Sequence, residues 1–316
     1  MSNTRIIAVV GATGAQGGGL ARAILADAAG GFTLRALTRK PDGDAAKALA
    51  AAGAEVVAAD LDDEASLRRA FEGAHGVYCV TNFWEHFSPD REMAQAKAMA
   101  QAAKAAGVQH AIWSTLEDSR RFVPLTDERM PTLMGRYKVP HFDAKGESDH
   151  FFADAGVPTS FLLTSFYWEN LIFFGMGPKP GAGGGLEWTM PLGTARFPGI
   201  GVEDIGRSAY GIFKRGADLV GKRVGIAGEH LTGAEMAAAL GDVLGQPVRY
   251  NAITPAQFRG FGFPGAEDLG NMFQFNTEFA ADFCRVRDLA ATRALNPALQ
   301  TFRQWLAANK ARIPLS

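Results

Sequence analysis

The sequence has few of the features that mark secreted, metal-binding or nucleic-acid-binding proteins. Its only cysteines are Cys79 and Cys284, which cannot form a disulfide framework and which fit a reducing compartment. The six histidines show neither an H-E-x-x-H motif nor pairing with cysteines, so we expect no metal site. The formal net charge is −1, so the bulk positive charge that attracts nucleic acid is missing, and we expect no direct nucleic-acid binding.

Long apolar runs are also missing. No run reaches the ~18 residues that a helix needs to cross a bilayer. The first residues enter a strand-like run directly and do not resemble a signal peptide. We therefore expect a cytoplasmic protein without membrane contact. The G-x-S-x-G motif of one class of hydrolases is absent as well, so that chemistry is not expected.

Short β-branched runs alternate with alanine-rich helical stretches in the first half of the chain. This alternation is typical of a parallel sheet that is covered by helices on both faces. The expected strands are Ile6–Val10, Phe32–Leu37, Glu55–Ala58, Gly76–Val80, Gln109–Trp113, Thr159–Thr164 and Val224–Ala227. The sequence predicts an α/β fold with a Rossmann-type, doubly wound parallel sheet.

Two later segments interrupt this alternation. Gly175–Gly201 is crowded with glycine and proline, and we expect a loop or an irregular segment instead of regular sheet. From His230 onward, a helix near Thr232–Leu244 leads into a region that is interrupted by proline and glycine. We interpret these segments as a second, smaller α/β domain. The expected boundaries are 1–168 plus about 200–229 for the Rossmann domain, and about 169–199 plus 230–316 for a substrate or partner domain.

The strongest local signal is the run from Val9 to Gly17, whose glycines Gly11, Gly14 and Gly17 are spaced G-x-x-G-x-x-G. It follows the first expected strand and opens a helix, as a dinucleotide-binding loop must. The first glycine turns the chain, the second lets backbone approach a pyrophosphate, and the third lets the helix pack on the strand. Helix N–H groups and the helix dipole then meet the phosphates. An ordinary tight turn is the alternative reading, and we favour a dinucleotide site.

The end of the second expected strand predicts which dinucleotide binds. An NAD site has a carboxylate there, whereas this chain has Thr38-Arg39-Lys40 and no acidic residue nearby. A guanidinium can pair bidentately with a 2′-phosphate, so we expect NADP(H), with Arg39 as the main ligand and Lys40 as an assistant. A solvated basic turn is the alternative. Asp60, which ends the third strand, is expected either to contact the adenine or to cap the next helix.

A reductase of this fold carries Tyr-x-x-x-Lys on the helix after the fifth strand. Here His141 stands in the tyrosine position and Lys145 in the lysine position. The lysine would hold the nicotinamide ribose. A histidine, with an unperturbed pKa of ~6.5, could serve as an acid, or it could only pack at the start of the helix.

Other residues near the expected site have two readings each. Ser114 and Thr115 end the fifth strand, where a hydroxyl could polarise a carbonyl or only satisfy backbone groups. The segment Phe166–Asn170 follows the sixth strand, where a nicotinamide would lie, but its aromatic residues could equally be core. A literal Tyr-x-x-x-Lys occurs at Tyr210 and Lys214, beyond the sixth strand, and we interpret it as a coincidental match.

Taken in order along the chain, these motifs resemble the NmrA-like family of atypical short-chain dehydrogenases/reductases, especially its NADP(H)-sensing members. The likeness runs nearly the full length. It is carried by Gly11–Gly17, Thr38-Arg39, Val80–Glu85, His141–Glu147, Tyr167–Asn170, Val202–Gly206, Gly262–Ala266 and Asn271–Phe273.

The resemblance implies a Rossmann domain, a small α/β domain and bound NADP(H). It also assigns a set of cofactor contacts, residue by residue. These are Gly11, Thr13, Gly14, Ala15, Gln16 and Gly17 at the phosphates, Arg39 and Lys40 at the 2′-phosphate, Asp60 and Leu61 on the adenine side, Thr81, Asn82 and Phe83 in the ribose region, and Lys145, Phe166, Tyr167, Glu169 and Asn170 in the nicotinamide half. The candidate catalytic residues are His141 and Lys145.

The missing tyrosine determines the functional expectation. Members that lack it are thought to report the NADPH/NADP⁺ ratio to protein partners, so we expect an NADP(H)-binding redox sensor with little or no turnover and a possible regulatory protein partner. The alternative is an NADPH-dependent reductase of a quinone or another conjugated carbonyl, with the proton supplied by His141 or water. The substrate, the partner and the oligomeric state stay open.

Overall fold

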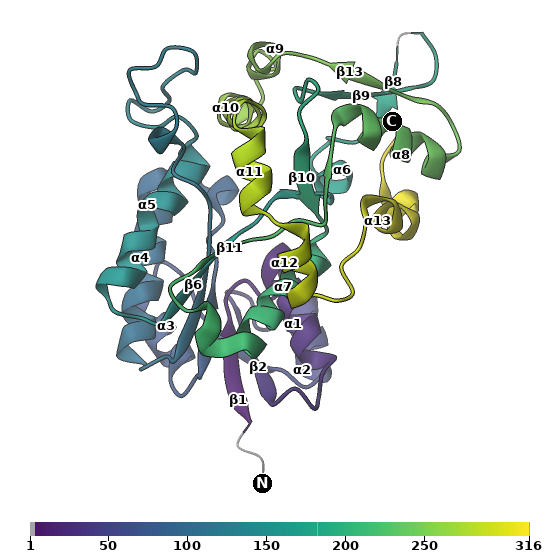
Figure 1. Cartoon of the computed structure of the whole chain (residues 1–316). Coiled ribbons are helices and arrows are strands. Elements are labelled where there is room, and N and C mark those ends of the chain that lie inside the picture. Colours follow the sequence, from purple (N-terminus) through teal and green to yellow (C-terminus); the bar gives the residue numbers. More distant parts are fainter. Residues whose placement is uncertain (1–3, 182, 316) are drawn as a thin grey trace. The chain divides into compact units, whose positions relative to one another are not determined.

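The computed structural model describes residues 4–181 and 183–315, and the chain divides into two compact units (Figure 1). The first unit consists of Met1–Asp118, His141–Leu163 and Ile205–Val224. The second consists of Ser119–Pro140, Thr164–Asp204 and Gly225–Ser316. None of the helices in the described part of the chain is both long and apolar enough to span a bilayer.

The first unit is built on a seven-stranded sheet. Its strands are β1 (Arg5–Val9), β2 (Phe32–Thr38), β3 (Glu55–Ala58), β4 (Gly76–Cys79), β5 (His110–Thr115), β6 (Thr159–Leu163) and β11 (Arg223–Gly225). Their order is β11-β6-β5-β4-β1-β2-β3, and the pairs formed among β1 to β6 are parallel. The order reverses between β1 and β4, which is the switch point where ligands bind in this fold. The predicted Rossmann-type fold is confirmed.

Helices follow most of these strands, as the alternation predicted. They are α1 (Ala15–Leu25), α2 (Asp44–Ala51), α3 (Glu64–Phe71), α4 (Pro89–Ala105), α5 (Pro140–Asp154) and α7 (Val202–Arg215), with short 3₁₀ turns η1 (Phe83–Glu85) and η3 (Gly216–Leu219). Two helices begin at side-chain caps. The Asp63 carboxylate accepts from the amide of Ser66 at 3.1 Å, and the Ser88 hydroxyl accepts from the amide of Arg91 at 3.2 Å. These bonds satisfy N–H groups that a helix start otherwise leaves unpaired.

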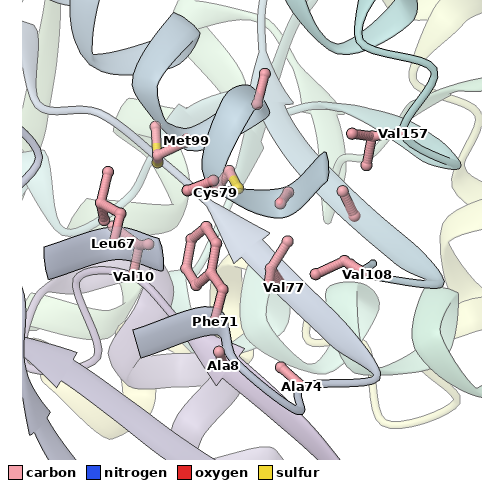
Figure 2. Packing of buried hydrophobic residues seen from close by; sticks show 14 of the residues in the cluster. Ala8, Val10, Leu67, Phe71, Ala74, Val77, Cys79, Met99, Val108 and Val157 are labelled. Atoms are coloured by element: carbon pink, nitrogen blue, oxygen red, sulfur yellow. The ribbon is translucent and has the colours of Figure 1, made fainter. Parts of the chain in front are cut away.

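A hydrophobic core joins one face of the sheet to α3, α4 and α5. Figure 2 shows Leu67 and Phe71 of α3 beside Val77 and Cys79 of β4, with Met99 of α4 next to them. All five side chains are fully buried. A buried aliphatic or aromatic side chain contributes ~1.5–3 kcal/mol, so this cluster holds the helices at defined positions on the sheet.

The second unit contains two small sheets and a set of short helices. Its strands are β7 (Phe166–Tyr167), β8 (Lys179–Pro180), β9 (Leu186–Met190), β10 (Phe197–Ile200), β12 (Glu229–Leu231) and β13 (Val248–Ala252), arranged as β12-β10-β7 and β13-β9-β8. Its helices are α6 (Asn170–Phe173), α8 (Gly233–Leu244), α9 (Pro255–Arg259), α10 (Ala266–Glu278), α11 (Ala280–Val286), α12 (Leu289–Leu295) and α13 (Phe302–Asn309), with 3₁₀ turns η2 (Ser119–Arg121) and η4 (Lys310–Arg312).

The expectation of an irregular segment over Gly175–Gly201 is wrong. Three strands, β8, β9 and β10, lie within it. In β9, Leu186, Trp188 and Met190 are buried and alternate with half-buried residues, which is the period of two that a strand requires. The glycines that dominate the composition cluster just before this strand, where Gly184 and Gly185 adopt positive φ, so they shape the turn and do not prevent the sheet.

Candidate functional site

The glycine-rich segment forms a tight turn between β1 and α1 in the first unit. Gly11 has a φ of 63°, and the amide of Gly14 donates to the carbonyl of Gly11 at 2.8 Å. A Cβ on Gly17 would lie 2.6 Å from the carbonyl oxygen of Val10, so a larger residue there would force the helix away from the strand. Gly14 is the N-cap of α1, and as a glycine it has no side chain that could accept hydrogen bonds from the first amides of the helix. The exposed start of a helix with its positive dipole end thus stands where a phosphate can approach.

Gln16, in the first turn of α1, ties the helix to the sheet. Its Oε1 accepts hydrogen bonds from the hydroxyl of Tyr78 in β4 and from Ser114 Oγ in β5, the latter at 2.7 Å. Ser114 therefore uses its single hydroxyl proton on Gln16. The neighbouring Thr115 is also engaged, because its Oγ1 lies 2.6 Å from Oδ1 of Asp149 and 3.1 Å from the carbonyl of Lys145. Ser114 thus bonds to a side chain, and Thr115 to a side chain and a backbone carbonyl, while a part of either hydroxyl in polarising a carbonyl stays a prediction.

Arg39 and Lys40 follow β2, and Arg39 is not a lone exposed cation. Its Nη1 forms an ion pair with Oε1 of Glu85 in η1. Lys40 lies in the turn, where its amide donates to Thr38 Oγ1 at 3.2 Å. The predicted 2′-phosphate ligand is thus on the surface at the carboxyl end of β2, with a carboxylate partner that sequence reasoning did not identify.

Asp60 and Leu61 lie just beyond the carboxyl end of β3. Asp60 is exposed, and its Oδ1 accepts from the amide of Asp62 at 3.0 Å. The cap of α3 is Asp63, so Asp60 does not serve as that cap. Its side chain stabilises the local turn, and Leu61 is half-buried beside it. An adenine contact by Asp60 stays a prediction.

Lys145 is the centre of a buried polar cluster at the carboxyl end of β4. From α5, its Nζ donates to Thr81 Oγ1 at 2.6 Å and lies 2.6 Å from Oε1 of Glu92. Thr81 Oγ1 in turn donates to the same Glu92 oxygen at 2.5 Å. Glu92 is in the first turn of α4 and has no exposed surface. Three elements that are distant in sequence thus converge on one ammonium group.

The charge state of Glu92 follows from its neighbours. Burial by itself raises the pKa of a carboxyl, but the Lys145 charge and the hydrogen-bond donors around it outweigh burial and lower the pKa of Glu92 to about 2. His86 lies on the other side, with Nε2 at 3.4 Å from Oε2 of Glu92. The Nδ1 of His86 accepts from the amide of Ser88 at 3.0 Å, so the proton of the neutral ring is on the nitrogen that faces Glu92.

His141 lies one turn before Lys145 on α5, within an aromatic group. Its ring centroid is 4.7 Å from that of Trp84 and 6.0 Å from that of Phe83, and the residue is 6% exposed. Phe83 is buried, whereas Asn82, immediately before it, is exposed. His141, Lys145, Thr81 and Phe83 are therefore all brought to the same edge of the sheet, and their contacts with a cofactor stay a prediction.

The remaining predicted contacts belong to the second unit. Phe166 is buried in β7 against Phe197, with ring centroids 5.3 Å apart, and Tyr167 is half-buried beside it. Both carboxylate oxygens of Glu169 are engaged, because Oε1 accepts from Trp305 Nε1 at 2.8 Å and Oε2 from the amide of Val202 at 3.0 Å. Burial raises the pKa of Glu169. Asn170 starts α6.

The literal Tyr-x-x-x-Lys match lies at a different place in the first unit. Tyr210 donates to Asp27 Oδ2 at 3.1 Å, and Lys214 lies 3.5 Å from the same oxygen. Asp27 follows the last turn of α1, whereas the glycine turn precedes its first turn. Burial, together with Asp27, raises the pKa of Tyr210 to about 12. This pair has the spacing of a catalytic motif but not its position.

Sequence reasoning missed Glu85 and Glu92. Glu92 had a detectable signal, because it has the helical spacing of the apolar residues Ala96 and Met99 and so lies on the buried face of α4, where a charge needs a partner. No cluster of three histidine, cysteine or acidic side chains suited to a metal ion occurs among the described residues.

Comparisons with known proteins identify the family. The sequence profile of the NmrA-like family matches residues 3–306. The chain is 32% identical over 288 residues to the NmrA-like family domain-containing oxidoreductase FrzB of Cladobotryum sp, across 86% of this chain and 84% of that protein. It is also 32% identical over 270 residues to an NAD(P)H azoreductase of Xenophilus azovorans, across 82% of each.

A similar fold is found among solved structures. The crystal structure of NmrA, a negative transcriptional regulator, in complex with NADP has a TM-score of 0.76 with 24% identity, over 96% of this chain and 95% of that one. At this identity the match describes the fold.

Proposed function

The chain belongs to the NmrA-like family, as its motifs predicted, and we propose that it is an NAD(P)H-dependent reductase of a quinone or another conjugated acceptor. The observation that carries the proposal is the Lys145 ammonium, which is buried and held at the carboxyl end of β4 by Thr81 and Glu92. A cation fixed at that edge, one strand from the glycine turn, suits the hydroxyls of a nicotinamide ribose.

The residues of the first unit fit a dinucleotide. Gly17 leaves no room for a side chain against Val10, and this close packing brings the start of α1 against the end of β1, where a pyrophosphate binds in this fold. Gly14 and Thr13 are exposed at the turn, and Arg39 supplies a guanidinium for a 2′-phosphate. When bound, the reduced cofactor supplies a hydride. We propose NADP(H) as the preferred form because of Arg39.

Lys145 and His141 have different roles in this proposal. Lys145 binds and orients the cofactor ribose, and the Glu92 carboxylate holds the ammonium in place. The proton that follows the hydride to the acceptor comes from His141 or from water. Ser114 is a poor donor for this step, because its hydroxyl proton is directed to Gln16.

The reductase role ranks above the sensor role that the sequence favoured. Two relatives of similar length are named an oxidoreductase and an NAD(P)H azoreductase, each at 32% identity. The regulator NmrA is less similar, at 24% identity. The sensor reading stays as a second candidate, because the tyrosine of the usual reductase motif is replaced by His141.

The test is consumption of NADPH and NADH by the purified protein with benzoquinones, an azo dye, and simple aldehydes as a negative panel. We expect turnover with a quinone or the azo dye and little with aldehydes. Lys145→Met should abolish turnover, whereas Tyr210→Phe, the matched control on the coincidental motif, should not. Tight cofactor binding without turnover of any acceptor would contradict the reductase role and favour the sensor.

A further inference from the structure

The surface between the ends of β2 and β4 carries an ion pair that joins distant segments. Arg39 follows β2, Glu85 lies in η1, and their side chains are 55% and 40% exposed. The hydrogen bond that Arg39 donates to Glu85 lowers the pKa of Glu85 and raises the pKa of Arg39. An exposed pair of this kind contributes little to stability. The two side chains can therefore separate readily when a ligand arrives that binds Arg39 more strongly than Glu85 does.

The charges around this pair cancel. Arg91 is near enough to influence Arg39, and it is bound through two nitrogens to the carboxylate of Asp62, at 2.5 and 3.3 Å. Asp60 also contributes a negative charge beside Arg39, and Lys40 a positive one in the same turn. The cations Arg39, Arg91 and Lys40 are thus offset by the carboxylates of Glu85, Asp62 and Asp60. A 2′-phosphate thus meets an arginine whose charge is already neutralised.

We infer that Glu85 is a second specificity-determining residue: it competes with the 2′-phosphate of NADP(H) for Arg39 and so lets the site accept NAD(H) as well. The inference rests on the proposed dinucleotide site. In this arrangement the 2′-phosphate of NADP(H) has to replace the Glu85 carboxylate as the partner of Arg39. The carboxylate remains close to the bound phosphate and repels it. NAD(H) leaves the Arg39–Glu85 pair intact and pays no such penalty. Glu85 thereby supplies, from η1, a negative charge beside the basic turn that follows β2.

The experiment measures dissociation constants of NADPH and NADH for the full chain and four variants. They are Glu85→Gln, Arg39→Ala, the double variant, and Glu64→Gln. Glu64 is a matched control, because it also pairs with an arginine, Arg68, in the first unit and its side chain is 36% exposed. Circular dichroism melting of each variant verifies folding.

The expected result is a change in selectivity. Glu85→Gln should bind NADPH about 1.5- to 5-fold more tightly, which is the worth of an exposed ion pair, and should leave NADH affinity unchanged. Arg39→Ala should weaken NADPH about ten- to a hundredfold. In the Arg39→Ala background the Glu85 change should have no effect, because the competition acts through Arg39.

The contrary outcomes separate this inference from the proposed function. An unchanged or lower NADPH preference in Glu85→Gln would overturn the competition while leaving dinucleotide binding in place. An equal gain in NADPH affinity in Glu64→Gln would show that the effect comes from general surface charge, and this would also overturn the competition. If the wild-type chain binds neither dinucleotide, the proposed function fails, and the role of Glu85 fails with it.

Discussion

Replacing Glu92 by glutamine should destabilise the protein strongly, although the change removes only one charge. Glu92 is fully buried and shares its Oε1 between Lys145 and Thr81. The glutamine variant keeps the shape of the side chain but leaves the Lys145 ammonium without a charged partner in a site that has little contact with water. An uncompensated buried charge is among the few causes of large single-residue destabilisation.

The magnitude follows from the pKa of the carboxyl. It falls from 4.5 to about 2 in the folded protein. At ~1.36 kcal/mol per pKa unit, the ionised carboxylate contributes about 3 kcal/mol at neutral pH. This agrees with the ~3–5 kcal/mol lost when one partner of a buried pair is removed. Because a lowered carboxyl pKa stabilises the fold only while the group is ionised, the contribution is complete above about pH 4.5 and is lost as the pH falls toward 2.

The assay is equilibrium urea unfolding from pH 7 to pH 3, followed by tryptophan fluorescence. Glu92→Gln should be less stable than wild type by about 3 kcal/mol at pH 7, and this difference should shrink below about pH 4.5. Glu64→Gln, which breaks the exposed pair with Arg68, should cost less than about 1 kcal/mol. A Glu92→Gln loss below about 1 kcal/mol at pH 7, or a difference independent of pH, would refute the argument.

Three further outcomes are expected. Gly17→Ala should weaken cofactor binding and lower the melting temperature, because the new Cβ would meet backbone oxygen atoms. Gly18→Ala should be tolerated, because the nearest neighbour of its Cβ is the flexible tip of Arg22 at 3.2 Å. Isothermal titration and melting curves test both variants. His141→Ala should lower kcat more than cofactor affinity if the imidazole supplies the proton, and steady-state kinetics that show unchanged kcat would assign the proton to water. Tyr210→Phe should leave turnover unchanged, since the hydroxyl donates to Asp27, and loss of that bond should cost ~0.5–1.5 kcal/mol of stability. A large fall in kcat would contradict its placement.

The positions of the strands of the large sheet along the chain and the glycine turn could be predicted because they depend on local pattern. Apolar runs alternate with helical stretches, and each expected strand lies within a residue or two of an observed one, as Ile6–Val10 does with β1. The Ser88 cap is a local feature of the same kind, since capping involves residues only three positions apart. The error at Gly175–Gly201 came from composition, because its many glycines masked the alternating residues of β9.

The sequence by itself determined the fold class and the family, and it supplied the residues of the proposed site: the glycine spacing, the basic turn at Arg39 and the lysine at 145. All of these are short-range patterns, and neighbours in sequence are necessarily neighbours in space. Only the tertiary structure decided the partners of these groups. Glu92 joins Lys145, and Glu85 joins Arg39, across 53 and 46 residues of sequence, because the parallel strands bring their carboxyl ends to one edge. The partner of a charged group at this edge depends on which distant segments the fold brings there, and no local sequence pattern encodes that partner.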